Sequence, residues 1–240
     1  MRIVHVSAEC YPMAKAGGLG DVVGALPKYQ QKIGQQAMVV MPMYKTAFLE
    51  KTSWDVVHKG DAFLGNWQFN YTIIQEQSGQ LGYPLYLVDI HGLLDRPKIY
   101  GYKDDTDRFI GFQIAVVDWL TSWKEAPDVV HCHDHQAGLV PFMMKYCYAY
   151  QKLASIKTIL TIHNAQYHGT IGWGVWCWTL VGLNHLTKDI SLKTIKAYGH
   201  SDAEIEDRVK RISHNNLIKS IKSMKSKDFV QCLLTKTLGK

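Results

Sequence analysis

A glycine-rich segment near the N-terminus, Lys15-Ala16-Gly17-Gly18-Leu19-Gly20-Asp21, has the composition of an anion-binding turn. Three glycines in four positions allow a backbone to approach a ligand closely. A short apolar run precedes the segment and an amphipathic run follows it, which predicts the order strand, turn, helix. Because the N–H groups at the start of a helix favour negative charge, and Lys15 adds a cation, the pattern indicates an anion site.

The segment does not match the standard nucleotide-binding loops. A dinucleotide-binding G-x-G-x-x-G pattern beginning at Gly18 would need a third glycine at position 23, which is Val23. Gly24 is one place late, and the G-x-x-x-x-G-K-[ST] pattern is absent. A tight strand–helix junction without a ligand is therefore the alternative interpretation.

A second polar cluster, His131-Cys132-His133-Asp134-His135, follows another apolar run. In an extended strand its three histidines would lie on one face, which suggests zinc. Zinc sites usually space their ligands by two to four residues and complete the set with a distant pair, which the sequence does not supply. We therefore expect no metal, and a polar wall in which Asp134 accepts hydrogen bonds from substrate hydroxyls.

A third polar pair, His163-Asn164, follows the apolar run 157–162. These side chains could bond to a sugar or a phosphate, or they could form a buried pair satisfied within the protein. Tyr100 and other aromatic residues lie in expected loops. Such residues suit sugar stacking, although packing of a lid over the core explains them almost as well.

Alternating strand-like and helix-like runs must position these clusters. The expected strands are 3–6, 37–41, 128–133 and 157–162, and the expected helices are 22–33, 109–123 and 138–150. Residues 54–89 are expected to form a β-rich insertion with turns at Gly60, Gly65-Asn66 and Gly79 to Gly82. This order predicts an α/β fold with a Rossmann-like, doubly wound, mostly parallel sheet. Since ligands bind beyond the carboxyl ends of such strands, the three clusters should converge on one crevice.

Composition excludes several classes of protein. The 240 residues lack an apolar run long enough to span a membrane, and the N-terminus lacks signal-peptide features. Five scattered cysteines favour reduced thiols, so we expect a cytoplasmic protein. The net charge of +6 lies entirely in residues 174–240. That basic stretch has few aromatic residues among its basic ones and no recognised motif, so we expect no nucleic-acid partner.

Four segments follow one another along the chain: Ser7-Ala8-Glu9 with the glycine turn through Pro27, Asp95-Arg96-Pro97 with Tyr100, His133 to Leu139, and Thr161 to Gly169. In this order they resemble segments of the bacterial glycogen synthases and plant starch synthases of glycosyltransferase family 5. The resemblance implies the N-terminal half of a GT-B fold, in which two Rossmann-like domains enclose the active site. It also implies transfer of glucose from ADP-glucose to the non-reducing end of an α-1,4-glucan with retention, and no cofactor.

The resemblance assigns roles to particular residues. Lys15, Gly17 and Gly18 would contact the phosphates of the donor, with Asp21 near them. Asp134, His163 and Asn164 would be the catalytic group that positions the transferred glucose, and Tyr100 would contact the acceptor or sugar.

The resemblance stops after Trp173, and family members are about twice as long. We therefore expect an acceptor-side domain in residues 1–173 and an unmatched basic tail in residues 174–240, frameshifted or disordered. A lone N-terminal domain should be inactive, and its uncovered face could support self-association. The choice of ADP-glucose over UDP-glucose would lie mostly in the missing domain. A non-catalytic glucan-binding fragment is the alternative function.

Overall fold

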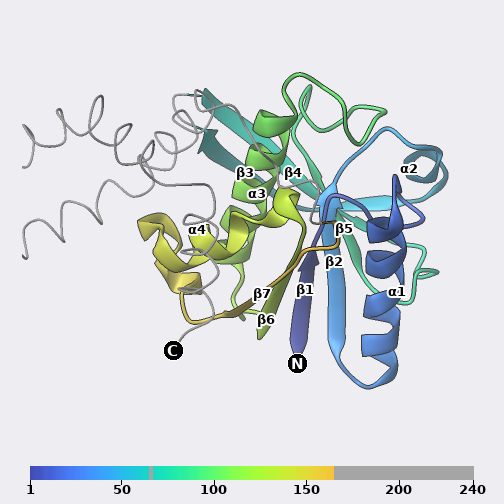
Figure 1. Ribbon diagram of the computed structural model, residues 1–240, viewed down its shortest axis with the longest axis horizontal. Coiled ribbons are helices and arrows are strands. Elements are labelled where there is room, and N and C mark those ends of the chain that lie inside the picture. Colours follow the sequence, from blue (N-terminus) through green and yellow to red (C-terminus); the bar gives the residue numbers. More distant parts are fainter. Residues whose placement is uncertain (65–66, 165–240) are drawn as a thin grey trace, which may run out of the picture.

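The computed structural model describes residues 1–64 and 67–164, which build one mixed sheet flanked by helices (Figure 1). The expected turn at Gly65-Asn66 and the expected tail 174–240 lie outside the described residues. The strands are β1 (Arg2–Val6), β2 (Gln36–Pro42), β3 (Trp54–Leu64), β4 (Trp67–Glu76), β5 (Leu85–Asp89), β6 (Val129–His133) and β7 (Lys157–Thr161). The helices are α1 (Gly18–Lys32), α2 (Ala47–Lys51), α3 (Asp105–Ser122) and α4 (Val140–Tyr146), with short 3-10 turns η1 (His135–Ala137) and η2 (Tyr148–Leu153).

The sheet has the order β3-β4-β5-β2-β1-β6-β7, and its larger part is parallel. Strand β1 pairs in parallel with β2 and with β6, so that His5 lies beside Val39 on one side and His131 on the other. Strand β7 continues the parallel order beyond β6. The predicted α/β, Rossmann-like, mostly parallel sheet is therefore confirmed.

The β-rich insertion joins the far edge of the same sheet. Strands β3 and β4 form an antiparallel pair, and β4 pairs antiparallel with β5. The predicted turn at Gly60 was wrong, because β3 runs through it. Gly60 lies opposite Tyr71, and a Cβ at Gly60 would stand 2.5 Å from the Tyr71 hydroxyl oxygen. The glycine makes room for a packed tyrosine within a continuous strand.

Helices α1 and α3 cover opposite faces of the sheet (Figure 1). Val39 packs in a cluster with Val23 of α1, whereas the next residue, Val40, packs in a cluster with Phe112 of α3. Since neighbouring residues of a strand point to opposite faces, the two helices must lie on opposite sides. The predicted well-buried helix at 109–123 is confirmed as α3. Among the described residues, no helix is long and apolar enough to cross a membrane.

Candidate functional site

The three polar clusters lie at or beyond the carboxyl ends of β1, β6 and β7, which are neighbours in the sheet. Asp134 and His163 are brought into direct contact, because the His163 backbone N–H donates to Asp134 Oδ1 at 2.7 Å. The Asp134 backbone N–H in turn donates to the carbonyl of Thr161 at 2.9 Å. Asn164 follows His163 at an exposed position. Asp134 and His163 thus meet at the carboxyl ends of two neighbouring strands, where the sequence predicted a ligand site.

The glycine turn is built around Glu9, a buried acid that the sequence reasoning did not assign to the site. Glu9 Oε2 accepts hydrogen bonds from the backbone N–H groups of Ala16, at 2.6 Å, and Gly17, at 3.0 Å. The N–H group of Gly17, expected to face a phosphate, is therefore engaged by Glu9. Helix α1 begins at Gly18, and an added Cβ at Gly17 or Gly18 would meet no atom within 4 Å. A ligand could approach this backbone closely.

Gly24 serves packing within the protein. A Cβ at this position would stand 2.6 Å from the backbone oxygen of Tyr11, in the segment that follows β1. The absence of a side chain therefore lets α1 lie against that segment. Gly24 helps to hold the start of α1 beside the carboxyl end of β1.

Lys15 and Asp21 pair with each other across the turn. Lys15 Nζ lies 2.7 Å from Asp21 Oδ2, and both side chains are about half exposed. An exposed pair of this kind contributes at most about 1 kcal/mol, so an incoming anion can compete for the ammonium group. Asp21 therefore contacts Lys15. Its connection with an anion at the turn is indirect and runs through the Lys15 ammonium group.

Tyr100 reaches the same centre from the loop before α3. Its hydroxyl donates to Glu9 Oε1 at 2.8 Å, and its ring lies 5.8 Å from the ring of Phe109. Burial, followed by the nearby Glu9 carboxylate, raises the pKa of Tyr100, which keeps the hydroxyl protonated as a donor. Tyr100 is thus a half-buried side chain whose hydroxyl is engaged by Glu9.

The buried guanidinium of Arg108 holds the loop that carries Tyr100. Arg108 donates to the carbonyls of Leu93 and Ile99, each at 3.0 Å, and to Asp105 Oδ1 at 2.5 Å. Its side chain is fully buried on α3. A buried charge is tolerated only with such partners, so Arg108 serves as an anchor for the loop. The sequence offered only an arginine within an apolar helix as a signal.

Asp134 has a strained backbone. Its φ of 57° and ψ of −175° lie in a region used mainly by glycine, and among the described residues it is the only non-glycine with positive φ. Strain of this kind collects at functional sites. The conformation lets the chain leave β6 with the Asp134 carboxylate directed at the start of the segment after β7, where it meets His163.

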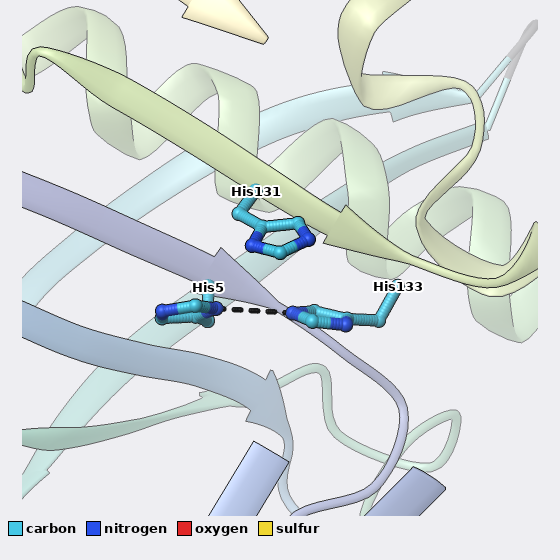
Figure 2. A group of neighbouring side chains, drawn as sticks. All are labelled: His5, His131 and His133. Carbon is cyan, nitrogen blue, oxygen red and sulfur yellow. Dashed lines mark hydrogen bonds between the residues drawn. The ribbon is translucent and has the colours of Figure 1, made fainter. Parts of the chain in front are cut away.

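Three histidines gather beside this site, but they are not the three that the sequence pattern grouped (Figure 2). His131 and His133 share one face of β6, whereas His135 falls in η1 after the strand has ended. The third member is His5, which pairs with His131 across β1 and β6. His5 Nδ1 lies 3.0 Å from His133 Nε2, and His131 Nε2 lies 2.7 Å from Thr161 Oγ1.

The arrangement of these rings favours hydrogen bonding over metal coordination. Zinc requires imidazole lone pairs that converge on one point about 2.0–2.1 Å away. The rings of His131 and His133 are instead stacked, with centroids 4.2 Å apart and planes 26° from parallel, so their lone pairs point along nearly parallel planes. Burial lowers the pKa of His5 and His133, and lowers that of His131 to about 4. All three are therefore neutral at pH 7.

The neutral cluster should make stability depend on pH. Below about pH 6.5 the histidines of the unfolded chain bind protons, whereas those of the folded cluster stay neutral because their pKa values are lowered. The contribution of the cluster to the free energy of unfolding is therefore fully present above that pH and decreases as the pH falls. For His131 this amounts to at most about 1 kcal/mol per pH unit between pH 6 and pH 5. We expect His131→Gln, which can still bond to Thr161, to reduce the slope by that amount in urea denaturation. An unchanged slope would contradict this account of the cluster.

Comparisons with known proteins agree with this fold. A family profile described as the starch synthase catalytic domain matches residues 2–223. The glycogen synthase of Flavobacterium johnsoniae is 50% identical over 173 residues, which are 72% of this chain and 37% of that protein. The glycogen synthase of Geobacillus stearothermophilus is 36% identical over 179 residues, which are 73% of this chain and 36% of that protein.

A solved structure shows the same fold. The catalytic domain of starch synthase IV from Arabidopsis thaliana, bound to ADP and acarbose, matches with a TM-score of 0.66 and 29% identity, over 72% of this chain and 36% of that one. The chain thus spans little more than a third of the length of these relatives. The matched residues contain the glycine turn, Asp134 and the strand that leads to His163, and the chain belongs to the starch synthase catalytic domain family.

Proposed function

We propose that this chain supplies the acceptor-side, N-terminal domain of a glycogen synthase. The complete enzyme would transfer glucose from ADP-glucose to the non-reducing end of an α-1,4-glucan with retention of configuration. The observation that carries the proposal is the contact between Asp134 and His163 at the sheet edge that also bears the glycine turn. The kinship with glycogen synthases, and a structural relative bound to ADP and acarbose, supports the substrates.

The donor diphosphate would lie at the glycine turn. Glu9 already uses the N–H groups of Ala16 and Gly17, so the groups left for an anion are those at the first turn of α1, from Gly18 onward, and the Lys15 ammonium. A cation and preorganised N–H groups stabilise the negative charge that develops on a departing diphosphate. Asp21 would lose Lys15 to the phosphates when the donor binds.

The transferred glucose would lie against Asp134, His163 and Asn164. Asp134 uses Oδ1 for the His163 backbone, while within residues 1–64 and 67–164 no group donates to Oδ2. That oxygen can accept a hydrogen bond from a sugar hydroxyl. Tyr100 would act through Glu9, which holds its hydroxyl, and would shape the wall between the turn and the sugar.

The proposed reaction requires a second domain that supplies the remaining contacts to the donor. We propose that residues 1–173 form the acceptor-side domain, and that the remaining donor contacts come from the part of the family fold that this chain does not match. The 240-residue chain should therefore show no glucosyl transfer from ADP-glucose to glycogen. A chimera that joins residues 1–164 to the rest of the Flavobacterium johnsoniae relative should show it.

The assay compares the 240-residue chain, the chimera and the intact relative, with ADP-glucose and UDP-glucose as donors and radiolabelled glycogen as the readout. Turnover by the chimera supports the proposal, and a folded but inactive chimera would contradict it. Normal turnover by the 240-residue chain alone would contradict the need for a second domain. Sedimentation of the chain with glycogen, without turnover in the chimera, would favour a glucan-binding module.

The edge strand β7 bears on the assembly of the protein. Ile159 of β7 and Ile162, just after its end, are about half exposed, and β7 is the last strand of the described sheet. An exposed apolar edge invites pairing with another chain. Self-association of the 240-residue chain through this edge is therefore a further expectation, which sedimentation velocity tests.

A further inference from the structure

A chain of hydrogen bonds connects helix α1 to the site through the interior of the domain. Gln30 Oε1 of α1 lies 2.7 Å from His5 Nε2, and His5 Nδ1 lies 3.0 Å from His133 Nε2. His133 Nδ1 then lies 2.9 Å from His163 Nε2. Figure 2 shows the central link, with the rings of His5 and His133 in line and joined edge to edge. Each inner histidine therefore uses both of its ring nitrogens.

This connectivity fixes the donor-to-acceptor direction of every hydrogen bond between Gln30 and His163. A neutral imidazole has one N–H donor and one acceptor nitrogen. Because Gln30 Oε1 accepts, His5 must donate from Nε2, and its Nδ1 is then an acceptor. His133 must donate from Nε2 to that nitrogen, and His163 must donate from Nε2 to His133 Nδ1. His163 Nδ1 is left with its lone pair.

Burial keeps each hydrogen-bonded histidine in a single tautomer. His5 and His133 are fully buried, and burial lowers the pKa of both, so neither carries a second proton at neutral pH. An inner histidine in the wrong tautomer would place two N–H groups, or two lone pairs, face to face in a buried position. Reversing one link therefore requires reversing every link, including the Gln30 amide.

We propose that Gln30, His5 and His133 are positioning residues that hold His163 in the Nε2–H tautomer. His163 then offers Nδ1 as a hydrogen-bond acceptor, and within the described residues no group donates to this nitrogen. The use of this acceptor for a hydroxyl of the bound sugar rests on the proposed function. The tautomer order itself is a property of the folded chain.

The test is a two-bond ¹H–¹⁵N NMR spectrum of histidine rings in the 240-residue chain at pH 7.5, assigned with single His→Gln variants. His5, His133 and His163 should each appear as Nε2–H with an unprotonated Nδ1, in at least about tenfold excess over the other tautomer, which corresponds to about 1.4 kcal/mol. A His163 ring protonated at Nδ1, or an even mixture, would overturn the proposal.

Variants of the end group show whether Gln30 sets the direction. Gln30→Met removes the acceptor and should let His163 populate both tautomers, whereas Gln30→Glu keeps an acceptor and should preserve the original pattern. Gln31→Met is the matched control, because Gln31 donates to the carbonyl of Ala37 and, among the described residues, is hydrogen-bonded to no histidine. An unchanged His163 in Gln30→Met would overturn the role of Gln30.

The NMR spectra and the activity assay test the two proposals independently. Ordered tautomers in the 240-residue chain together with an inactive chimera would reject the proposed function and leave the histidine chain standing. An active chimera together with disordered tautomers would reject the histidine chain alone.

Discussion

Asp134→Gly should reduce glucosyl transfer by the chimera at least about 100-fold while changing the free energy of unfolding by less than about 1 kcal/mol. The variant loses the carboxylate that binds the His163 backbone and faces the proposed sugar position. It also relieves a backbone with φ of 57° and ψ of −175°, a conformation that glycine adopts without strain. The lost hydrogen bond and the relieved strain offset each other in the stability of the fold.

The control for this prediction is Asp134→Ala, which loses the same hydrogen bond and keeps the strain. It should be less stable than Asp134→Gly by about 1–3 kcal/mol. Urea denaturation of the 240-residue chain measures both variants, and the chimera assay measures turnover. Equal stabilities of the two variants would contradict the strain at Asp134. Full turnover by the Asp134→Gly chimera would contradict a catalytic role for this carboxylate.

Glu9→Ala should lower the free energy of unfolding by about 3–4 kcal/mol, because it leaves three polar groups without their partner. These are the N–H groups of Ala16 and Gly17 and the hydroxyl of Tyr100. Glu9 is only 4% exposed, so water cannot readily replace the lost carboxylate. In the chimera the loosened turn should also raise the KM for ADP-glucose more than it lowers kcat.

Tyr100→Phe is the matched variant, since it removes only one of the three hydrogen bonds. It should cost about 1 kcal/mol, and the double variant Glu9→Ala/Tyr100→Phe should be more stable than the sum of the two effects predicts. Urea denaturation of the four proteins gives this coupling directly. Additive effects would mean that Glu9 and Tyr100 act independently, and would contradict a shared centre beneath the turn.

Glu9 changes how the glycine turn is understood. From its composition the turn was an anion site made of glycine N–H groups and Lys15. In the folded domain a buried carboxylate holds the first part of the turn in place, and Asp21 holds Lys15. The groups open to a ligand are therefore fewer and lie farther along, at the first turn of α1.

Local patterns in the sequence were enough to predict the architecture and the edge that carries the site. Apolar runs and helical spacing act over a few residues, so they indicate strands and helices without knowledge of the fold. Because parallel strands end on the same side of a sheet, the sequence alone predicts that the clusters at the ends of β1, β6 and β7 lie close together. The sequence likewise predicts that His131 and His133 lie on one face, because side chains two residues apart in a strand point the same way.

Only the tertiary structure decided which groups touch. His5 and His133 are 128 residues apart in the chain, and Tyr100 and Glu9 are 91 apart, so their contacts depend on sheet register and on the paths of loops. Periodicity carries no information over such separations. His5 therefore stands in the cluster where the sequence pattern had placed His135, and the Tyr100 hydroxyl bonds to Glu9, because buried polar groups bond to the partners that the fold brings near them.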